Sequence, residues 1–211
     1  MNKTRNLIAA AAFAALALSP ALAAPETYKI DPAHTQATFS IRHNMVSRVQ
    51  GGFKSVGGEI TVDKDNWSAS KVKAEIDATT INTGNDKRDA HLKSDDFFKT
   101  EKNPKITFES TSVTSPGPDK LTVNGNLTMA GVTKPVTLDV TVGGFSAGVA
   151  GFEAKTKINR KDFGIIWNHT LDAGGVVLGE DVDITITVEA RTPPKEAPKA
   201  DDKKPAVPEK K

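Results

Sequence analysis

Residues 182–188 read Val-Asp-Ile-Thr-Ile-Thr-Val, with an apolar side chain at every second position. Residues 136–142, Val-Thr-Leu-Asp-Val-Thr-Val, repeat this pattern. Successive side chains of a β-strand point to opposite faces, so each stretch predicts a strand with one apolar and one wet face. The same alternation recurs in five further stretches: residues 39–41, 60–62, 72–76, 106–108 and 152–158. A sheet with one apolar face must cover that face with a second layer or close on itself.

The strands are separated by short polar turns, which predicts an all-β fold, an antiparallel barrel or sandwich. Turn signals include Gly57-Gly58 and Gly143-Gly144, whereas the alternation continues unbroken through Asn124-Gly125. We therefore predict a long strand with a bulge or bend at Asn124-Gly125, ending at residues 130–133. One or two short helices are expected between Asp86 and Phe98, with Ser94 as an N-cap.

The ends of the chain differ in composition from the middle. Lys3, Arg5, the apolar run 7–18 and the small-x-small site at 21–23 indicate a signal peptide cleaved after Ala23. This run is too short to span a bilayer. Residues 192–211 are rich in proline and lysine, which predicts a disordered tail. Residues 24–191 then form one domain, exported to the periplasm, and with no cysteine it must be held together by burial alone.

The charge balance excludes one class of partner. Of the 28 Lys and Arg residues, two lie in the signal peptide, so 26 remain against 26 Asp and Glu. No basic stripe with interleaved aromatic residues is visible, so we expect no nucleic-acid partner. The sequence shows no apolar segment long enough to predict a membrane-spanning protein. Transient contact with a membrane and pairing into a homodimer both remain open.

Several positions predicted to point inward carry small side chains: Ala74, Ala78, Ala154 and Thr156. An eight-stranded barrel has an interior that is either filled by side chains or holds one small ligand. Small inward residues favour the second case.

Four segments form a more specific pattern. They are Tyr28-Lys-Ile-Asp-Pro-Ala-His34 with its continuation to Phe53, Arg88-Asp-Ala-His-Leu-Lys-Ser-Asp-Asp-Phe-Phe98, Gly125-Asn-Leu-Thr-Met-Ala-Gly-Val-Thr-Lys-Pro-Val136 and Asn159-Arg-Lys-Asp-Phe-Gly-Ile-Ile-Trp-Asn168. In this order and spacing, the chain from Thr27 to Ala190 resembles the YceI family of bacterial, mostly periplasmic, polyisoprenoid-binding proteins.

The resemblance implies an elongated, lipocalin-like antiparallel barrel of about eight strands. It also implies a long isoprenoid or related lipid in the lumen, such as a polyprenyl quinone or a fatty amide, with no cofactor and no catalytic residue set. The expected function is that of a non-enzymatic periplasmic carrier.

Strand phase gives the residues expected to contact such a lipid. They are Phe39, Ile41, His43, Val72, Ile76, Phe108, Leu127, Leu138, Val140, Phe152, Ile158, Ile184 and Ile186, with Phe97, Phe98, Phe163 and Trp167 closing the cavity. His43 and Arg160 are the candidates for contact with a polar head. The segment 159–162, Asn-Arg-Lys-Asp, is read either as a clamp for a phosphate or quinone head or as a surface turn with internal ion pairs.

Other chemistries leave weaker signals. His34, His43, His91 and His169 could bind zinc only by converging with each other or with Asp31 or Asp172, and no spacing suggests a metal site. No G-x-S-x-G motif indicates a serine hydrolase. Two alternatives remain open: an envelope stress-response protein that binds other proteins, and an enzyme acting on a quinone or an oxidant through Arg42, His43 or Arg160.

Overall fold

The computed structural model describes residues 24–172 and 174–194. The predicted signal peptide and residues 195–211 of the predicted tail lie outside the described part.

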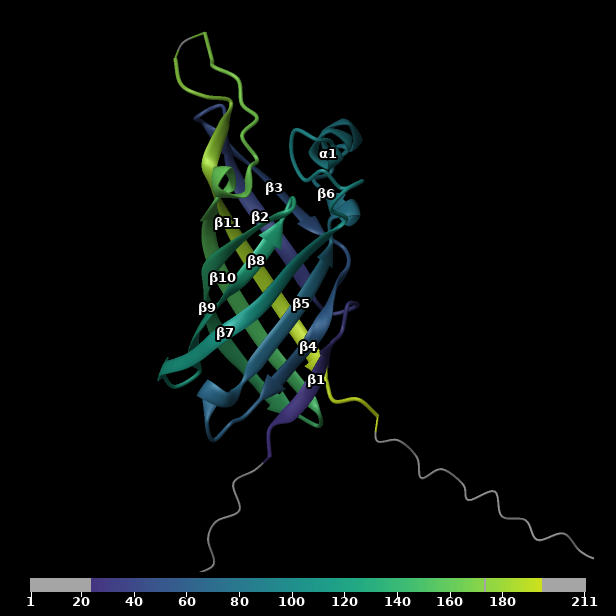
Figure 1. Cartoon of the computed structure of the whole chain (residues 1–211), viewed down its shortest axis with the longest axis vertical. Helices are drawn as coiled ribbons and strands as arrows, with labels where there is room; N and C mark the ends of the chain where they lie inside the picture. Colours follow the sequence, from purple (N-terminus) through teal and green to yellow (C-terminus); the bar gives the residue numbers. More distant parts are fainter. Residues whose placement is uncertain (1–23, 173, 195–211) are drawn as a thin grey trace, which may run out of the picture.

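The described chain forms an antiparallel β-barrel with one α-helix at one end (Figure 1). The strands are β1 (Glu26–Ile30), β2 (Gln36–His43), β3 (Ser47–Phe53), β4 (Val56–Val62), β5 (Lys71–Asp77), β6 (Ile81–Asn82), β7 (Lys105–Gly117), β8 (Lys120–Met129), β9 (Val132–Ser146), β10 (Val149–Asn159) and β11 (Leu178–Arg191). All seven alternating stretches of the sequence lie in strands, which confirms the predicted all-β fold.

Eleven strands make an eight-stranded barrel because three of the barrel strands are interrupted. Both β1 and β2 pair antiparallel with β11, Ile30 with Ala190 and Ala37 with Ile186, so they continue each other. In the same way β3 and β4 pair with β2 and β1, and β6 and β5 pair with β3 and β4. The β1–β11 pairing closes the ring, so the apolar faces enclose a common interior.

The turns agree in part with the predictions. β8 runs straight through Asn124-Gly125, with a register shift opposite it in β7, as predicted. It ends in a two-residue turn at Ala130 (φ 50°) and Gly131 (φ 82°), which fits the positive dihedrals of a tight hairpin turn.

Two predicted turns are wrong. Gly57-Gly58 lies inside β4, and a Cβ at Gly58 would be 2.1 Å from the carbonyl oxygen of Lys73 in β5. Gly143-Gly144 lies inside β9, where the pairing with β10 shifts register. These glycines therefore mark close approach and a bulge within strands.

A helix lies in the predicted segment 86–98, but its N-cap is not the predicted Ser94. α1 (Asp86–Lys93) starts at Asn85, whose side chain accepts a hydrogen bond from the backbone N–H of Arg88 at 3.0 Å. Ser94 is the C-cap, not an N-cap, because its N–H donates to the carbonyl of His91. In the described ranges, no helix is long and apolar enough to cross a membrane.

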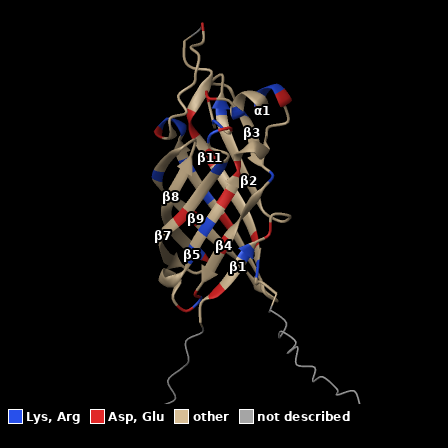
Figure 2. Cartoon of the chain, turned by 45° about the vertical axis from the view of Figure 1, so that its right-hand side comes forward, with Lys and Arg blue, Asp and Glu red and all other residues tan. Residues whose placement is uncertain are grey.

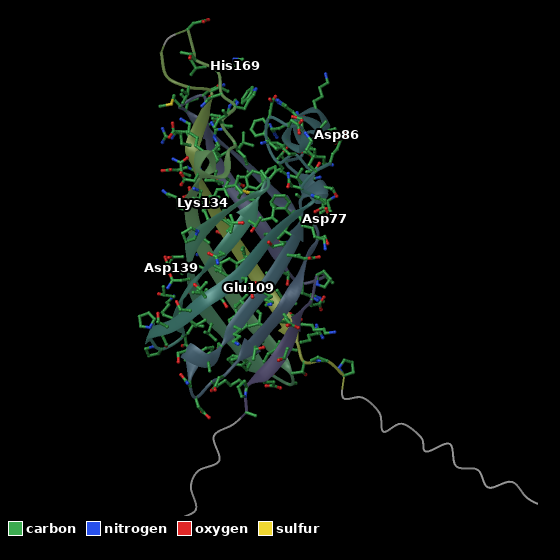
Figure 3. All side chains as sticks on the ribbon, viewed as in Figure 1. Asp77, Asp86, Glu109, Lys134, Asp139 and His169 are labelled. Atoms are coloured by element: carbon green, nitrogen blue, oxygen red, sulfur yellow. The ribbon has the colours of Figure 1, made fainter. Side chains whose placement is uncertain are left out.

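Buried apolar side chains form two clusters, one in each half of the barrel. The cluster distant from α1 contains Tyr28, Ala150 and Ala190, and the cluster next to α1 contains Phe97 and Phe163. The outside of the barrel carries interspersed acidic and basic residues, and Glu109, Lys134 and Asp139 point away from it (Figures 2 and 3). Exposed pairs such as Lys73–Glu109 at 3.0 Å contribute at most about 1 kcal/mol each, so burial holds the fold.

Candidate functional site

The barrel encloses a cavity of about 480 Å³, within the usual range of roughly 300–1,000 Å³ for ligand pockets. Its wall is predominantly aliphatic and aromatic. Ala74, Ala154 and Thr156 lie on this wall and leave space that larger side chains would fill. The fourth small residue, Ala78, is packed in the core cluster next to α1 instead. Protein side chains therefore do not fill the interior.

Most residues selected from strand phase lie on the cavity wall. They are Phe39, Ile41, His43, Val72, Ile76, Phe97, Phe98, Phe108, Leu127, Leu138, Val140, Phe152, Ile158, Trp167, Ile184 and Ile186. Arg160 is also on the wall. That any of these residues contacts a lipid stays a prediction.

Phe163 is the exception, because it is 1 % exposed and packs in the core without lining the cavity. It ends the 3₁₀ helix η3 (Arg160–Phe163), where the two-residue period of β10 no longer applies. Ile165, two residues further on, lies on the wall.

Aromatic side chains gather at both ends of the cavity. At the end distant from α1, Phe145 packs against Tyr28, Trp67 and Phe152, with ring centroids 6.0, 6.4 and 5.9 Å apart. Of these, Trp67 and Phe152 reach the wall, and Phe145 packs behind them.

At the other end, the segment that follows α1 and the loop after η3 supply most of the aromatic wall. Trp167 packs against Phe97 and His91, with ring centroids 5.4 and 5.2 Å apart, and Phe98 packs edge-on against Phe53 at 5.7 Å. The cavity reaches the surface here, since the exposed residues Lys87 and His91 form part of its wall.

The charged and imidazole side chains on the wall all come from this end. Lys87, Arg88 and His91 lie on α1, His43 ends β2, and Arg160 begins η3. β2 and η3 meet at β11, because His43 pairs with Leu178 and the Arg160 side chain donates to the adjacent Gly179 carbonyl. Among the described residues of the wall, none is Asp or Glu.

Arg160 follows the inward-facing phase of β10, two residues after Ile158. Its guanidinium donates from Nε to the Gly179 carbonyl at 2.8 Å and from Nη1 to the Ile165 carbonyl at 2.7 Å. Nη2 is buried and has no hydrogen-bond partner among the described residues. Burial lowers the pKa of the Arg160 guanidinium, and the charge of Glu180 opposes this shift.

The residues flanking Arg160 point the other way, so the two readings of segment 159–162 divide between its members. The Asn159 side chain accepts from the backbone N–H of Lys161 at 2.9 Å, and Lys161 pairs with Glu180 on the surface. Hydrogen bonds from Lys161 and then Asn159 lower the pKa of the Glu180 carboxyl. This part is a surface turn with its own ion pair, and only Arg160 faces the cavity.

The predicted set lacks the basic residues of α1 and the wall residues Trp67 and Val177. It also lacks several wall residues that share the predicted strand phase, among them Ile60, Ile106 and Val182. The α1 segment and the loop 164–177 carry no strand alternation, so phase could not assign an inward face to them. For Arg160, by contrast, the phase of β10 was a usable signal.

The histidines do not converge on one site. His34, Asp31 and Glu189 offer ligand atoms within 4.8 Å of one another, on the outside of the barrel. Both carboxylates also accept from Arg191, at 3.0 and 2.6 Å, and His34 Nδ1 donates to the Asp31 carboxylate at 3.0 Å. The hydrogen bond with His34 is the main cause that lowers the pKa of Asp31. We therefore describe this group as an ion-pair network.

One wall histidine has an acidic partner, since His91 Nε2 lies 2.9 Å from Asp96 Oδ2. Arg42, named for the enzyme alternative, is exposed and donates to the carbonyl of Met45 in the β2–β3 turn. His43 is on the wall, but the described wall supplies no carboxylate to orient it as a Ser-His-Asp site requires.

Comparison with known proteins agrees with this architecture. The YceI-like domain model matches residues 28–190. Protein YceI of Escherichia coli O6:H1 is 41 % identical over 184 residues, which is 84 % of this chain and 93 % of that protein. A UPF0312 protein of Staphylococcus aureus is 40 % identical over 168 residues, 77 % of this chain and 95 % of that protein.

Solved structures share the barrel. The Campylobacter jejuni YceI protein gives a TM-score of 0.62 at 34 % identity and covers 72 % of this chain and 90 % of its own. A polyisoprenoid binding domain from Saccharophagus degradans, implicated in plant cell wall breakdown, gives 0.61 at 17 % identity, covering 79 % and 98 %. At that identity the second match bears on the fold alone. The extent of the family match and the identity to its members show that this chain belongs to the YceI family.

Proposed function

We propose that this protein binds one long isoprenoid-type lipid inside its barrel and carries it through the periplasm. The observation that supports this most is the apolar cavity of about 480 Å³. The name of the S. degradans domain, which shares the fold, agrees with the ligand class. Export to the periplasm follows from the signal peptide read from the sequence.

The physical chemistry of the cavity suits a hydrocarbon chain. Each buried CH₂ group contributes about 0.8 kcal/mol, so one five-carbon isoprene unit contributes roughly 3–4 kcal/mol before the entropy of ordering the chain is subtracted. A tail of several units can bind by burial alone. Polar contacts are then needed only at the head.

Lipid exchange requires access to a membrane, and the exposed apolar residues suit this step. In the described part of the chain, the large apolar side chains that are exposed are Met45 (47 %), Val46 (88 %) and Ile166 (70 %). We call these three residues the rim patch. Met45 and Val46 form the β2–β3 turn, and Ile166 lies between the wall residues Ile165 and Trp167. The rim patch therefore flanks the end where the cavity reaches the surface, and it would touch a bilayer transiently during loading.

The direct test is organic extraction of the purified protein followed by mass spectrometry, with titration of the stripped protein by a prenyl alcohol. We expect a co-purifying lipid and saturable binding at one site. Ala74→Phe should weaken binding at least about tenfold, because the ring would project into the cavity at a wall position.

The matched control is Lys73→Ala, the outward-facing neighbour in the same strand, which is 63 % exposed at its side chain. Its binding should equal that of the unmodified protein. No lipid in the extract together with no binding on titration would refute the proposal.

A further inference from the structure

The charged side chains on the described cavity wall, those of Lys87, Arg88 and Arg160, are all basic. Lys87, Arg88, His91, His43 and Arg160 line the end next to α1, and no described Asp or Glu lies on the wall. Apolar side chains make up most of the remaining wall. A bound amphiphile would thus find its hydrocarbon environment along the barrel and its polar environment beside α1.

Arg160 differs from the other cations of this end by its burial. It is only 3 % exposed, whereas Lys87 is exposed. Arg88 directs its Nε and Nη2 groups to the hydroxyl and carbonyl of Thr83, at 2.7 and 2.9 Å. Arg160 uses two nitrogens on neutral carbonyls and keeps Nη2 without a partner in the described chain.

Among the described residues, no carboxylate forms an ion pair with Arg160, and Glu180 acts on its charge only from a distance. The carboxylate of Glu180 is engaged by Lys161 and Asn159 on the outer surface. A buried charge without a partner is costly, so such groups are normally paired. The described part of the chain does not supply this partner.

We propose that the lipid carried by this protein has an anionic oxygen head, a phosphate or a carboxylate, and that this head lies at the α1 end of the cavity against Arg160. This inference rests on the proposed lipid-binding function. It adds the chemical class of the head and its position in the barrel.

The charge of the head matters here more than it would in water. A guanidinium attracts an anion more strongly in a low-dielectric interior, and its hydrogen bonds to an anion are stronger than those to a neutral oxygen. A neutral alcohol adds no negative charge next to Arg160. An anionic head compensates it while the tail remains in the apolar part of the cavity.

The test uses pairs of probes with identical tails. Geranylgeranyl phosphate is compared with geranylgeraniol, and palmitic acid with palmitamide, by titration into the stripped full chain. We expect each anion to bind at least about tenfold tighter than its neutral counterpart. The pair with the larger ratio distinguishes a phosphate head from a carboxylate head.

The variant Arg160→Gln should reduce this ratio to near one, while binding of geranylgeraniol changes little. Retained binding of the alcohol shows that the barrel is intact. Arg160→Lys, which keeps the charge, should retain part of the preference. Lys161→Gln is the matched control, because it removes a neighbouring charge on the outer face, and its ratio should equal that of the unmodified protein.

Equal binding of charged and neutral probes by the unmodified protein would overturn the assignment and leave lipid binding in place. A preference that persists in Arg160→Gln would overturn the role of Arg160. If none of the four probes binds, both this inference and the proposed function fail.

Discussion

The environment of Tyr28 shows how burial acts on one residue. Tyr28 is 1 % exposed, and its hydroxyl donates a hydrogen bond to the carboxylate of Glu26. Burial contributes most to raising the pKa of Tyr28 from 10.0 to about 12, and the hydrogen bond to Glu26 contributes next. Both favour the protonated phenol in the folded state.

A pH dependence follows from this shift. Below pH 10 Tyr28 is neutral in both states, whereas above it the unfolded chain loses the proton and the folded chain keeps it. The free energy of unfolding should therefore fall as pH rises from about 10 to about 12, by at most about 2–3 kcal/mol. Denaturant titrations across this range measure the fall.

Tyr28→Phe provides the control, because it should lack this component of the alkaline loss. Tyr28 is the single tyrosine of the sequence, so tyrosinate absorbance reports its ionisation alone. A midpoint near pH 10 in the folded protein would contradict the prediction.

Residue-level prediction succeeded where the strand period continued and failed where it stopped. Arg160 is one step beyond Ile158 in the phase of β10 and lies on the cavity wall, although the sequence analysis named it for its charge and not for its phase. Phe163, three residues later, lies off the wall because η3 has replaced the strand geometry. The missing hydrogen-bond partner of Arg160 depends on where Gly179 and Ile165 place their carbonyls, and no local sequence pattern carries that information.

At the scale of elements, glycines set how closely neighbouring side chains approach. In β3, Gly51 pairs with Phe39 of β2, and a Cβ there would lie 2.6 Å from the Phe39 ring and 2.7 Å from Thr83 Cγ2. The ring of a wall residue thus occupies the space that a side chain at position 51 would need. Gly57 in β4 has no atom within 4 Å of such a Cβ.

We predict that Gly51→Ala destabilises the protein by about 1–3 kcal/mol, because the Phe39 ring must move within a packed wall. Gly57→Ala, the matched control, should be neutral or stabilising by up to about 1 kcal/mol, since it only restricts the unfolded chain. Chemical denaturation measures both changes.

A double-mutant cycle identifies the cause. In a Phe39→Ala background the ring is absent, so Gly51→Ala should cost at least about 1 kcal/mol less than it does alone. Equal costs in the two backgrounds would show that the Phe39 ring is not the obstacle.

Most strands were predictable because they have a buried and a solvated face, and the positions of the turns were less predictable. Ala130-Gly131 forms a true turn, whereas Gly143-Gly144 lies at a register shift within β9. The distinction depends on the partner strand, which is distant in sequence. The cap of α1 was misplaced for a related reason: Asn85 and Ser94 both suit an N-cap, and the helix between them has almost no apolar face.

At the scale of the whole molecule, closure of the barrel creates the enclosed interior, which no individual strand defines. The composite strands β1/β2, β3/β4 and β5/β6 reduce eleven strands to an eight-stranded ring, and only this ring defines an enclosed interior. Small residues in the sequence favoured an open lumen, but its size and its basic end depend on where α1 and the loop 164–177 lie. Both gather at the same end of the barrel, where His169 marks the loop and Asp86 the helix (Figure 3).

This arrangement places the rim patch beside the basic end of the cavity, which leads to a prediction about lipid uptake. The turn at Met45 and the loop 164–177 are joined by a hydrogen bond from the Asn44 N–H to the Val177 carbonyl at 2.7 Å, and Val177 is a wall residue. A bilayer in contact with the patch would therefore meet the cavity opening directly. Val46→Asp should slow transfer of a fluorescent prenyl lipid from vesicles to the protein several-fold, because a charge at this position opposes insertion into the apolar part of the bilayer.

Equilibrium affinity for the detergent-solubilised lipid should be unchanged in Val46→Asp, since Val46 is 88 % exposed and does not line the cavity. The control Ser146→Asp adds the same charge at the β9–β10 turn, which lies at the opposite end of the barrel because β10 runs from there toward η3. Its transfer rate should match that of the unmodified protein. Stopped-flow fluorescence separates rate from affinity, and a Val46→Asp rate equal to that of Ser146→Asp would mean that the lipid enters without contact between the rim patch and the membrane.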